Sequence, residues 1–556
     1  MNDEQEKQVC CIVGAILGVI FFIIIYGFRV LNPTYDEWLL GKGDLTQHYL
    51  GWCFFRKGNW AFPFGLTNQL AYPSYSSVIF TDSIPVFAVL FKLLSPLLPE
   101  TFQYFGLWGL LCFCLQGYFA AKILRELGVG KIQTLIGCVF FIVSPTVIEK
   151  MFRHTALAGH WLILLTIYLF VSHRRMYRDL RRTSLYWGIV GALIASIHLY
   201  YLPMCGMFLG GYLLCSLVCD YLKEHKLKLR YLLPGAAFAI GLFFNTWILG
   251  GFSSGASSEG DGLGRFSFNL NGFFNAKGYS RIFDALVTYR DGQYEGFAYL
   301  GLGIFLLILV SLFYVLICIV RKSVKKDQDF FVYGIVYVLM SLGLIIFAAS
   351  PEVSFNGRLL FTVPYSSTLY HYWGMFRSTG RIVWPVCYLI YVAVILCCDR
   401  MLNKNKIWKI IGCSLLCVCV FIQIFDLSLK ITEQQNNYNT IVKYDSPLQA
   451  EIWKKIAASG KVKHVVWVSN NFDNNEIMHI AKYALDNDMT MNTYYFARAI
   501  NINENTRQSM EKLSDDCMYL FRTVDNDNDQ YSPYEFDLEL HEADGYIIGT
   551  TFELVK

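Results

Sequence analysis

Long apolar runs fill the first three quarters of this 556-residue chain and set its fold class. The first run extends from Cys10 to Val30, and a membrane-spanning α-helix needs about 20 such residues. Ten more runs follow before residue 430. We therefore predict a polytopic α-helical membrane protein with about 11 transmembrane helices, at residues 10–30, 102–121, 132–149, 156–172, 184–202, 204–219, 231–250, 297–320, 330–349, 382–398 and 408–428.

The composition supports this prediction. Apolar residues make up 55% of the chain and charged residues only 16%, whereas a soluble domain carries about 25% charged residues. A soluble enzyme, a disordered chain and a nucleic-acid-binding protein are therefore excluded, and membrane lipids become the expected surroundings. The first run is not a cleaved signal peptide, because it is too long and no small-residue cleavage site follows it.

Charge divides the chain into two parts. Residues 430–556 hold 12 Lys/Arg against 20 Asp/Glu, a net charge of −8, which leaves +12 for the first 429 residues of a chain with a total of +4. We predict a transmembrane domain at 1–429 and a soluble α/β domain at 430–556. Alternating and helical apolar patterns in the second part predict strands at 462–468, 489–496 and 546–554 and a helix at 475–487.

Basic clusters predict the orientation. Lys and Arg gather on alternate connections between the apolar runs, and such loops are cytoplasmic in membrane proteins. The N-terminus is then cytoplasmic, and the C-terminal domain is extracytoplasmic, as are a first outer loop at 31–101 and a mobile, Gly/Ser-rich loop at 251–296. The clusters lie at Lys122–Lys131, Arg174–Arg182, Lys223–Arg230, Arg321–Lys326 and Arg400–Lys409.

One apolar run, Ile84–Leu98, does not fit this count. It has only 15 residues and contains two prolines and a lysine. We interpret it as a helix at the outer membrane surface, with a short tilted span as the alternative.

The first outer loop carries acidic and basic residues close to the membrane. Asp44 and His48 are one helical turn apart, and Trp52 continues that face. Arg56 follows one turn later, and Asp82 stands just before the surface run, where a buried acid is costly without a purpose. The alternatives are a helix cap for Asp44, a turn residue for Asp82 and an interfacial belt for the aromatics.

Further arginines and histidines come from the other outer loops. Arginine is unexpected on the outer side, and its guanidinium matches phosphate oxygens in two-pronged fashion. We therefore predict a site for a lipid-linked phosphate or pyrophosphate, with snorkelling to the interface as the alternative. The residues concerned are Arg153, His154, His160, Tyr294, Glu295, Arg377 and Arg381.

Two other patterns carry less weight. The 17 cysteines show neither metal-binding spacing nor a secreted disulfide pattern, although Cys53 and Cys517 stand in polar stretches and a bridge between them is an option. Asp525, Asp527 and Asp529 resemble a calcium loop, but the glycine and glutamate that such a loop requires are missing. A polar turn fits them better.

Three segments resemble an uncharacterised bacterial membrane-protein family of the GT-C glycosyltransferase superfamily. They are GDLTQHYLGWCFFRKGNWAFPFG at 43–65, VIFTDSIP at 78–85 and FQYFGLWGLLCFCLQGYFAAKIL at 102–124, and the layout of residues 9–430 is similar as well. The resemblance implies a multi-pass enzyme of the bacterial plasma membrane. It would transfer a hexose or pentose, with inversion, from a polyprenyl-phosphate-linked donor to a cell-surface or lipid-linked glycan acceptor.

The resemblance also implies roles for the residues. Asp44 would be the base or a metal ligand, with Asp36 and Glu37 as second choices. His48 and Asp82 would join it in catalysis. If a divalent cation such as Mg²⁺ or Mn²⁺ assists, Asp44 and Asp82 would bind it. Arg56, Arg153, His154, Arg377 and Arg381 would bind the donor phosphate and lipid, and Trp52, His160, Tyr294 and Glu295 would bind substrate.

Two other functions remain open. A lipid or glycan flippase is one, but such transporters usually show inverted repeats, and none is evident here. A non-catalytic scaffold with a glycan-binding outer domain is the other. The chain lacks the WWDYG-type motif of oligosaccharyltransferases and any nucleotide-binding glycine pattern in a sensible context.

Overall fold

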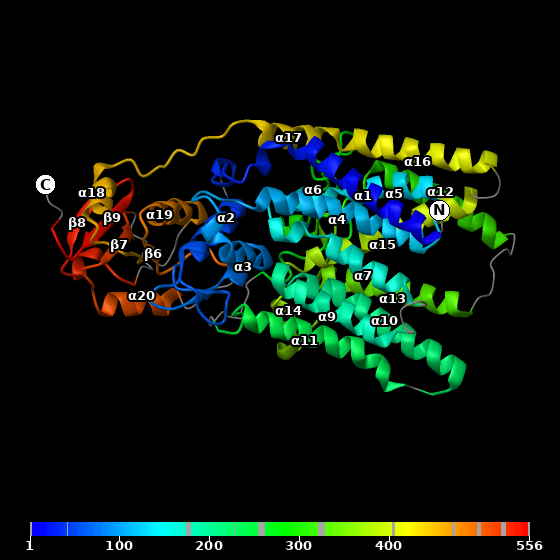
Figure 1. Cartoon of the computed structure of the whole chain (residues 1–556), viewed down its shortest axis with the longest axis horizontal. Helices are drawn as coiled ribbons and strands as arrows, with labels where there is room; N and C mark the ends of the chain where they lie inside the picture. Colours follow the sequence, from blue (N-terminus) through cyan, green and yellow to red (C-terminus); the bar gives the residue numbers. More distant parts are fainter. Residues whose placement is uncertain are drawn as a thin grey trace.

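The computed structural model describes residues 3–41, 43–173, 179–226, 228–253, 262–320, 328–402, 406–469, 473–497, 502–523 and 530–553. Long helices form an elongated bundle, and a smaller α/β domain sits beyond one end of it (Figure 1). The N-terminus and the C-terminal sheet lie at opposite ends of the long axis.

Nine helical segments of the described chain are long and apolar enough to cross a membrane. The prediction of a polytopic helical protein is confirmed in this form, with nine such segments rather than 11. The other two predicted spans fall on α7 (Trp161–Val171), which is short, and on α9 (Leu180–Ile197), which begins next to Arg181 and Arg182. The nine segments are α1 (Asp3–Tyr26), α4 (Phe105–Glu126), α5 (Lys131–Ile142) with α6 (Pro145–Lys150), α10 (Tyr201–Glu224), η6 (Leu229–Leu232) with α11 (Leu233–Ile248), α12 (Leu302–Val320), α13 (Gln328–Ala349), η8 (Thr379–Val383) with α15 (Trp384–Leu402), and α16 (Lys406–Asp426).

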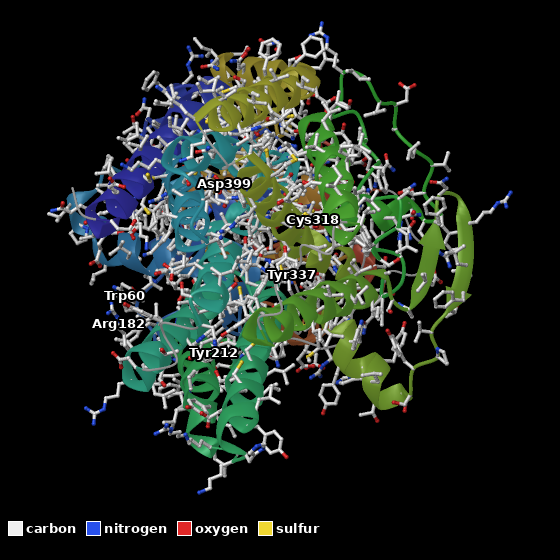
Figure 2. The ribbon with its side chains drawn as sticks, turned by 90° about the vertical axis from the view of Figure 1, so that its right-hand side faces the viewer. Trp60, Arg182, Tyr212, Cys318, Tyr337 and Asp399 are labelled. Carbon is white, nitrogen blue, oxygen red and sulfur yellow. The ribbon has the colours of Figure 1, made fainter. Side chains whose placement is uncertain are left out.

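The bundle is apolar both inside and outside. Figure 2 views it from the N-terminal end and labels Tyr212 and Asp399, two of its buried side chains. Leu309, Ile346 and Phe421 are exposed on the outer surface of their helices. A helix that is apolar on all sides suits a hydrocarbon surrounding better than water.

Glycines let α1 and α4 pack closely. A Cβ atom on Gly14 would stand 2.5 Å from the Gly117 carbonyl oxygen, and one on Gly117 would stand 2.0 Å from the Gly14 carbonyl oxygen. Small residues at such crossings allow two backbones to approach, which is the main packing device available between helices in lipid.

The long loop between α1 and α4 is folded into the body of the protein. Its helix α2 (Asp44–Lys57) is buried over most of its length, including Trp52, Phe54 and Phe55, so these aromatics are core residues and not an interfacial belt. The predicted surface helix is α3 (Pro85–Leu93), whose nine residues are far fewer than a span requires. The other elements of this loop are η1 (Arg29–Leu31), η2 (Glu37–Leu39), β1 (Leu66–Thr67), β2 (Ser76–Ser77), η3 (Val78–Thr81) and η4 (Ser95–Leu97).

Short elements also occupy the later loops at the same end of the bundle. The strands β3 and β4 form an antiparallel hairpin. These elements are η5 (Thr155–Ala158), η7 (Asp291–Gly296), β3 (Glu352–Phe355), β4 (Arg358–Thr362) and α14 (Ser367–Gly374).

The C-terminal domain is a five-stranded mixed sheet in the order β6-β5-β7-β9-β8. Strand β5 runs parallel to β6 and β7, whereas β9 runs antiparallel to β7 and β8. Helix α17 (Ser428–Asn439) leads into it from α16. Its elements are α18 (Glu451–Ser459), β5 (His464–Trp467), α19 (Asn474–Asp486), β6 (Thr490–Met491), α20 (Ile502–Glu511), β7 (Cys517–Arg522), η9 (Pro533–Glu535), β8 (Glu539–Ala543) and β9 (Tyr546–Thr550).

Residues 491–497, here called the docking segment, explain why the strand predicted at 489–496 ends after Met491. The segment leaves the sheet and runs along the first long loop. The Met491 amide donates to the Gln69 carbonyl at 2.8 Å, and the Ala497 amide donates to the Phe80 carbonyl at 2.8 Å. Tyr494 donates its hydroxyl to the Gln47 carbonyl at 2.6 Å. The domain is therefore fastened to the loop by backbone pairing.

The structure tests the predicted cysteine pair, whereas several other predictions concern residues outside the described ranges. Cys53 and Cys517 are both free, so the optional disulfide is wrong. The calcium-like residues Asp525, Asp527 and Asp529 lie outside the described residues, as do residues 254–261 of the Gly/Ser-rich loop and several basic residues, including Arg174, Arg175, Arg178, Arg321, Lys322, Lys325, Lys326 and Lys404.

We expect Gly14→Leu to destabilise the protein by about 1–3 kcal/mol, because the new side chain must push α1 away from α4. The measurement is the thermal unfolding midpoint in detergent. Gly210→Leu is the matched control, since Gly210 is an exposed helical glycine with nothing within 4 Å of its would-be Cβ. An unchanged midpoint for Gly14→Leu would contradict the packing argument.

Candidate functional site

A cavity of about 470 Å³ opens where the first long loop, the ends of α9 and α11, residues 375–381 and the docking segment meet. Its charged side chains come from separate parts of the chain. Asp44 is the first residue of α2, and Asp82 follows η3. His198 caps the end of α9, and Arg381 lies in η8 before α15. The cavity thus collects residues from across the whole chain.

The cavity has two chemically different sides. Asp44, Asp82, His154, His198, Arg377 and Arg381 are on its polar side. Its apolar side includes Leu199, Leu202, Leu242, Phe243, Phe252 and Phe376. Phe243 and Phe252 are exposed where the cavity reaches the surface of the bundle. A molecule with a charged head and a long apolar chain would match both sides.

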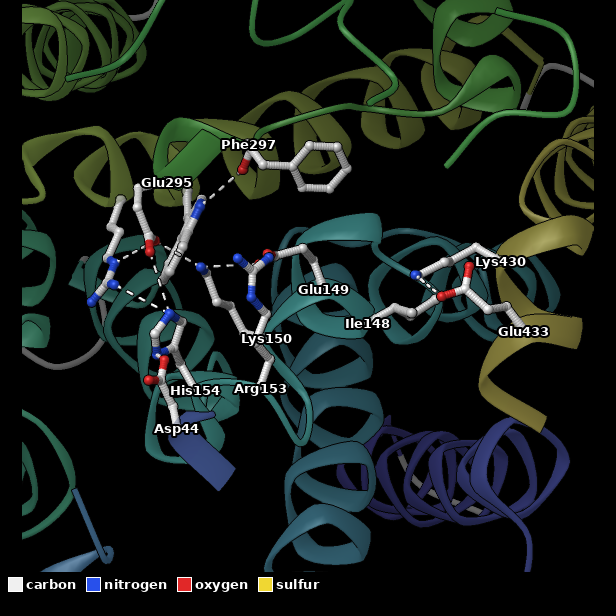
Figure 3. A network of polar contacts seen from close by, with 12 residues as sticks. Asp44, Ile148, Glu149, Lys150, Arg153, His154, Glu295, Phe297, Lys430 and Glu433 are labelled. Atoms are coloured by element: carbon white, nitrogen blue, oxygen red, sulfur yellow. Dashed lines mark hydrogen bonds and ion pairs between the residues drawn. The ribbon is translucent and has the colours of Figure 1, made fainter. Parts of the chain in front are cut away.

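His154 links Asp44 to Glu295 (Figure 3). Its Nδ1 lies 3.0 Å from Asp44 Oδ2, and its Nε2 lies 3.3 Å from Glu295 Oε1. Burial raises the pKa of Asp44, but the hydrogen bond and charge of His154 outweigh burial, so the pKa lies below its ordinary value. Asp44 is therefore held ionised and in one orientation.

A buried charge cluster supports this pair. Lys150 Nζ lies 2.8 Å from Glu295 Oε2 and 3.0 Å from Glu149 Oε2, and Arg381 Nε lies 2.8 Å from Glu295 Oε2. Side-chain exposure is only 1% for Lys150 and 4% for Glu295. Burial raises the Glu295 pKa, but Arg381, Lys150 and His154 together hold it well below its ordinary value. Arg153 closes the cluster by pairing with Glu149.

A second His–Asp pair faces the same cavity. His198 Nε2 lies 3.4 Å from Asp82 Oδ1, and the effect of His198 on the Asp82 carboxyl outweighs burial and lowers its pKa. Asp82 has a φ of +53°, in the left-handed region that non-glycine residues rarely adopt. Such strain persists only where the surroundings enforce it, and here it directs the carboxylate toward His198.

His48 lies beneath both acids without lining the cavity. It is fully buried, and neither ring nitrogen has a hydrogen-bond partner among the described residues. Burial lowers its pKa to about 4, against the opposing effect of Asp82 and Asp44. His48 is therefore neutral at pH 7.

Five of the sequence-predicted residues meet in the cavity: Asp44, Asp82, His154, Arg377 and Arg381. Glu295 and Arg153 belong to the charge cluster behind it. Of the five residues in the cavity, Arg377 has an exposed side chain that forms no hydrogen bond or ion pair with any described residue. It is the guanidinium free to bind a ligand.

The other predicted site residues have structural partners elsewhere. Arg56 donates to the carbonyls of Pro99 and Glu100, each at 2.8 Å, and so fixes the loop after α3. Trp52 is buried and donates to the Phe102 carbonyl, and His160 bonds Tyr388 inside the bundle. Tyr294 lies under the Arg153 guanidinium. None of the four lines the cavity.

Several residues of this site were missed from the sequence. His198 lay inside a predicted span, and Glu149 and Lys150 lay at the end of another. Charged residues at the end of an apolar run are a usable signal, and it could have singled out Glu149 and Lys150. Tyr495, from the docking segment, also lines the cavity, but no local pattern marks it.

The optional metal site at Asp44 and Asp82 lacks support from geometry. Within the described ranges, no group of three or more His, Cys, Asp or Glu side chains is placed to hold a metal ion. Each acid is instead paired with a histidine. We therefore assign these two acids no metal-binding role.

Comparison with known families covers both parts of the chain. The model of a family described as Domain of unknown function (DUF6311) matches residues 15–428, and that of the DUF6311 C-terminal domain matches residues 452–551. No curated protein matches the chain.

We expect Lys150→Met to destabilise the protein by about 3–5 kcal/mol, because it leaves the buried carboxylates of Glu149 and Glu295 short of a cation. Unfolding should be measured at pH 7. The Glu295 pKa is lowered on folding, so its pairing contributes fully above about pH 4.3 and is lost as the pH falls through its folded-state value.

Arg265→Met is the control for Lys150→Met. Arg265 pairs with Asp291 at 2.7 Å, but both side chains are exposed, so the loss should be much smaller than for Lys150→Met. Equal losses in the two variants would contradict the assigned role of the buried cluster.

Proposed function

We propose that this chain, which belongs to the DUF6311 family, is a membrane glycosyltransferase. It would move a sugar from a polyprenyl-phosphate-linked donor to a cell-surface or lipid-linked glycan. The resemblance of residues 43–65, 78–85 and 102–124 to an uncharacterised membrane-protein family of the GT-C superfamily supports the reaction class. Fold resemblance alone does not establish a function, and the cavity gives the stronger support.

The cavity with one polar and one apolar side is the main support for this proposal. Its polar side joins two carboxylates to arginines and histidines, and its apolar side, built on α9 and α11, reaches the surface of the bundle. A polyprenyl-phosphate sugar has the same division. The isoprenoid chain would lie along Leu242 and Phe243, and the phosphate and sugar would lie at the acids.

Asp44 is the proposed general base. It accepts the proton of the acceptor hydroxyl while that oxygen forms a bond to the anomeric carbon of the donor sugar. The bond from this carbon to the phosphate oxygen breaks, and its electron pair leaves with the phosphate. A single displacement of this kind inverts the anomeric centre. His154 keeps the Asp44 carboxylate ionised and oriented toward the cavity.

Arg377 is the proposed phosphate-binding residue. Arg381 is largely neutralised by Glu295 at 2.8 Å, whereas Arg377 has no described partner. A fixed positive charge stabilises a leaving phosphate most where water is scarce. Asp82, paired with His198, would orient the sugar hydroxyls.

We place the cavity on the extracytoplasmic side of a bacterial plasma membrane. The N-terminus lies at the opposite end of the long axis from the C-terminal domain (Figure 1). The described basic residues Arg125, Lys131, Arg181 and Arg182 stand in the last or first turns of α4, α5 and α9, beside the connections that the positive-inside rule assigns to the cytoplasm.

Asp44→Asn should lower sugar transfer by at least about 100-fold, since removing a general base costs about 10²–10⁴ in rate. The assay follows label from a panel of polyprenyl-phosphate sugars into envelope glycan. Asp36→Asn should stay near wild type, because Asp36 accepts a hydrogen bond from Tyr49 and does not line the cavity. Transfer by Asp44→Asn at the wild-type rate would remove Asp44 as the base. No transfer by wild type would favour a flippase or a scaffold.

His154→Gln should move the acid limb of kcat/KM for transfer to higher pH. The imidazole lowers the Asp44 pKa, and burial raises it. Without the imidazole, Asp44 is protonated, and so inactive as a base, at a higher pH than in wild type. A profile from pH 4 to 8 measures the shift, and an unmoved acid limb would count against the assigned role of His154.

A further inference from the structure

We propose that a second cavity, on the other face of the first turn of α2, binds the glycan acceptor. This inference rests on the proposed function, because it assigns the second substrate of the same reaction. The cavity measures about 790 Å³, larger than the first. Four remote segments enclose it: the start of the first long loop, Phe152, residues 437–445 at and beyond the end of α17, and helix α19 of the C-terminal domain.

The two cavities share one wall. Asp44 and Gln47 of α2 line the first cavity, whereas Leu45 and Thr46 line the second. The turn that contains Phe152 and His154 also separates the two cavities. His154 faces the first cavity, and Phe152 faces the second. An acceptor bound in the second cavity would extend past the first turn of α2 to bring its reacting hydroxyl to Asp44.

A strained turn produces this arrangement beside α2. Phe152 has a φ of +58°, a left-handed conformation that is unfavourable for a bulky side chain. It places the Phe152 ring against Trp38 at 4.9 Å and Tyr438 at 5.0 Å between ring centroids. These three rings form the apolar floor of the cavity.

The polar groups above this floor fit a neutral, hydroxyl-rich ligand. Glu37 and Asp445 are balanced by Lys443 and Lys482, so the charged lining carries no net charge. The side chains of Glu37, Lys443 and Asp445 have no hydrogen-bond or ion-pair partner among the described residues. They are free to accept from and donate to sugar hydroxyls.

The C-terminal domain takes part in this site. Helix α19 contributes Asn475, His479 and Lys482 to the cavity, and His479 Nδ1 lies 2.9 Å from the Tyr444 hydroxyl of the preceding linker. The domain therefore helps to choose the acceptor, while the membrane bundle holds the donor.

Gly41→Trp tests this assignment. Gly41 lines the cavity, has nothing within 4 Å of its would-be Cβ, and has a φ outside the glycine-favouring region. The full-length protein is titrated with fluorescent oligosaccharides released from bacterial envelope glycans by mild acid. We expect wild type to bind at least one of them, and Gly41→Trp to bind it at least tenfold more weakly. Lys454→Trp, on the exposed face of α18 and outside the cavity, should bind as wild type does.

Two readouts separate this inference from the proposed function. Asp44→Asn should bind the oligosaccharide normally, because the base faces the other cavity. Where transfer is measurable, Gly41→Trp should raise the acceptor KM and leave the donor KM unchanged. Binding that Gly41→Trp does not weaken, or no binding by wild type, would overturn the acceptor site. Normal binding without transfer by wild type would instead overturn the glycosyltransferase proposal alone.

Discussion

The structure depends on compensating buried charge at the end of an apolar bundle. Glu295 is almost fully enclosed, and it stays ionised only because Lys150, Arg381 and His154 converge on it. An unpaired buried charge is far more costly than a buried pair. Because these side chains must meet at Glu295, the segments that carry them are held together: α6 and the chain after it, η7 and η8. Through His154 it also fixes Asp44, so the stability of the bundle and the chemistry of the cavity share the same contacts.

Much of the fold could be predicted from the sequence, because the period and length of apolar runs are local signals. Nine predicted spans, α19, β5 and β9 all follow from such patterns. The limits of the predictions are also physical. Residues 489–496 have the composition of a strand, but only Thr490 and Met491 form one, and the chain from Met491 onward runs along the first long loop. Arg56 resembled a phosphate ligand, but nearby carbonyl oxygens occupy its guanidinium.

The polar residues of the site were predicted only in part for a similar reason. Asp44, Asp82, His154, Arg377 and Arg381 stood out because charge near a membrane needs a cause, and they meet in one cavity. Their partners did not stand out. Lys150 and Glu295 are 145 residues apart in the chain, and Asp82 and His198 come from different loops. Such pairings are set by tertiary packing, which a single sequence does not report.

The docking segment gives the protein an order of assembly. Gln47 and Tyr495 are in contact across 448 positions of sequence, so closing the cavity means closing almost the entire chain into one loop. Domains generally form in order as a chain is synthesised from its N-terminus. The helical bundle can therefore be in place while the cavity still lacks Tyr495 and Ala497. A chain released before these residues would hold its acids in an open cleft, so completion of the polypeptide itself times the appearance of a finished site.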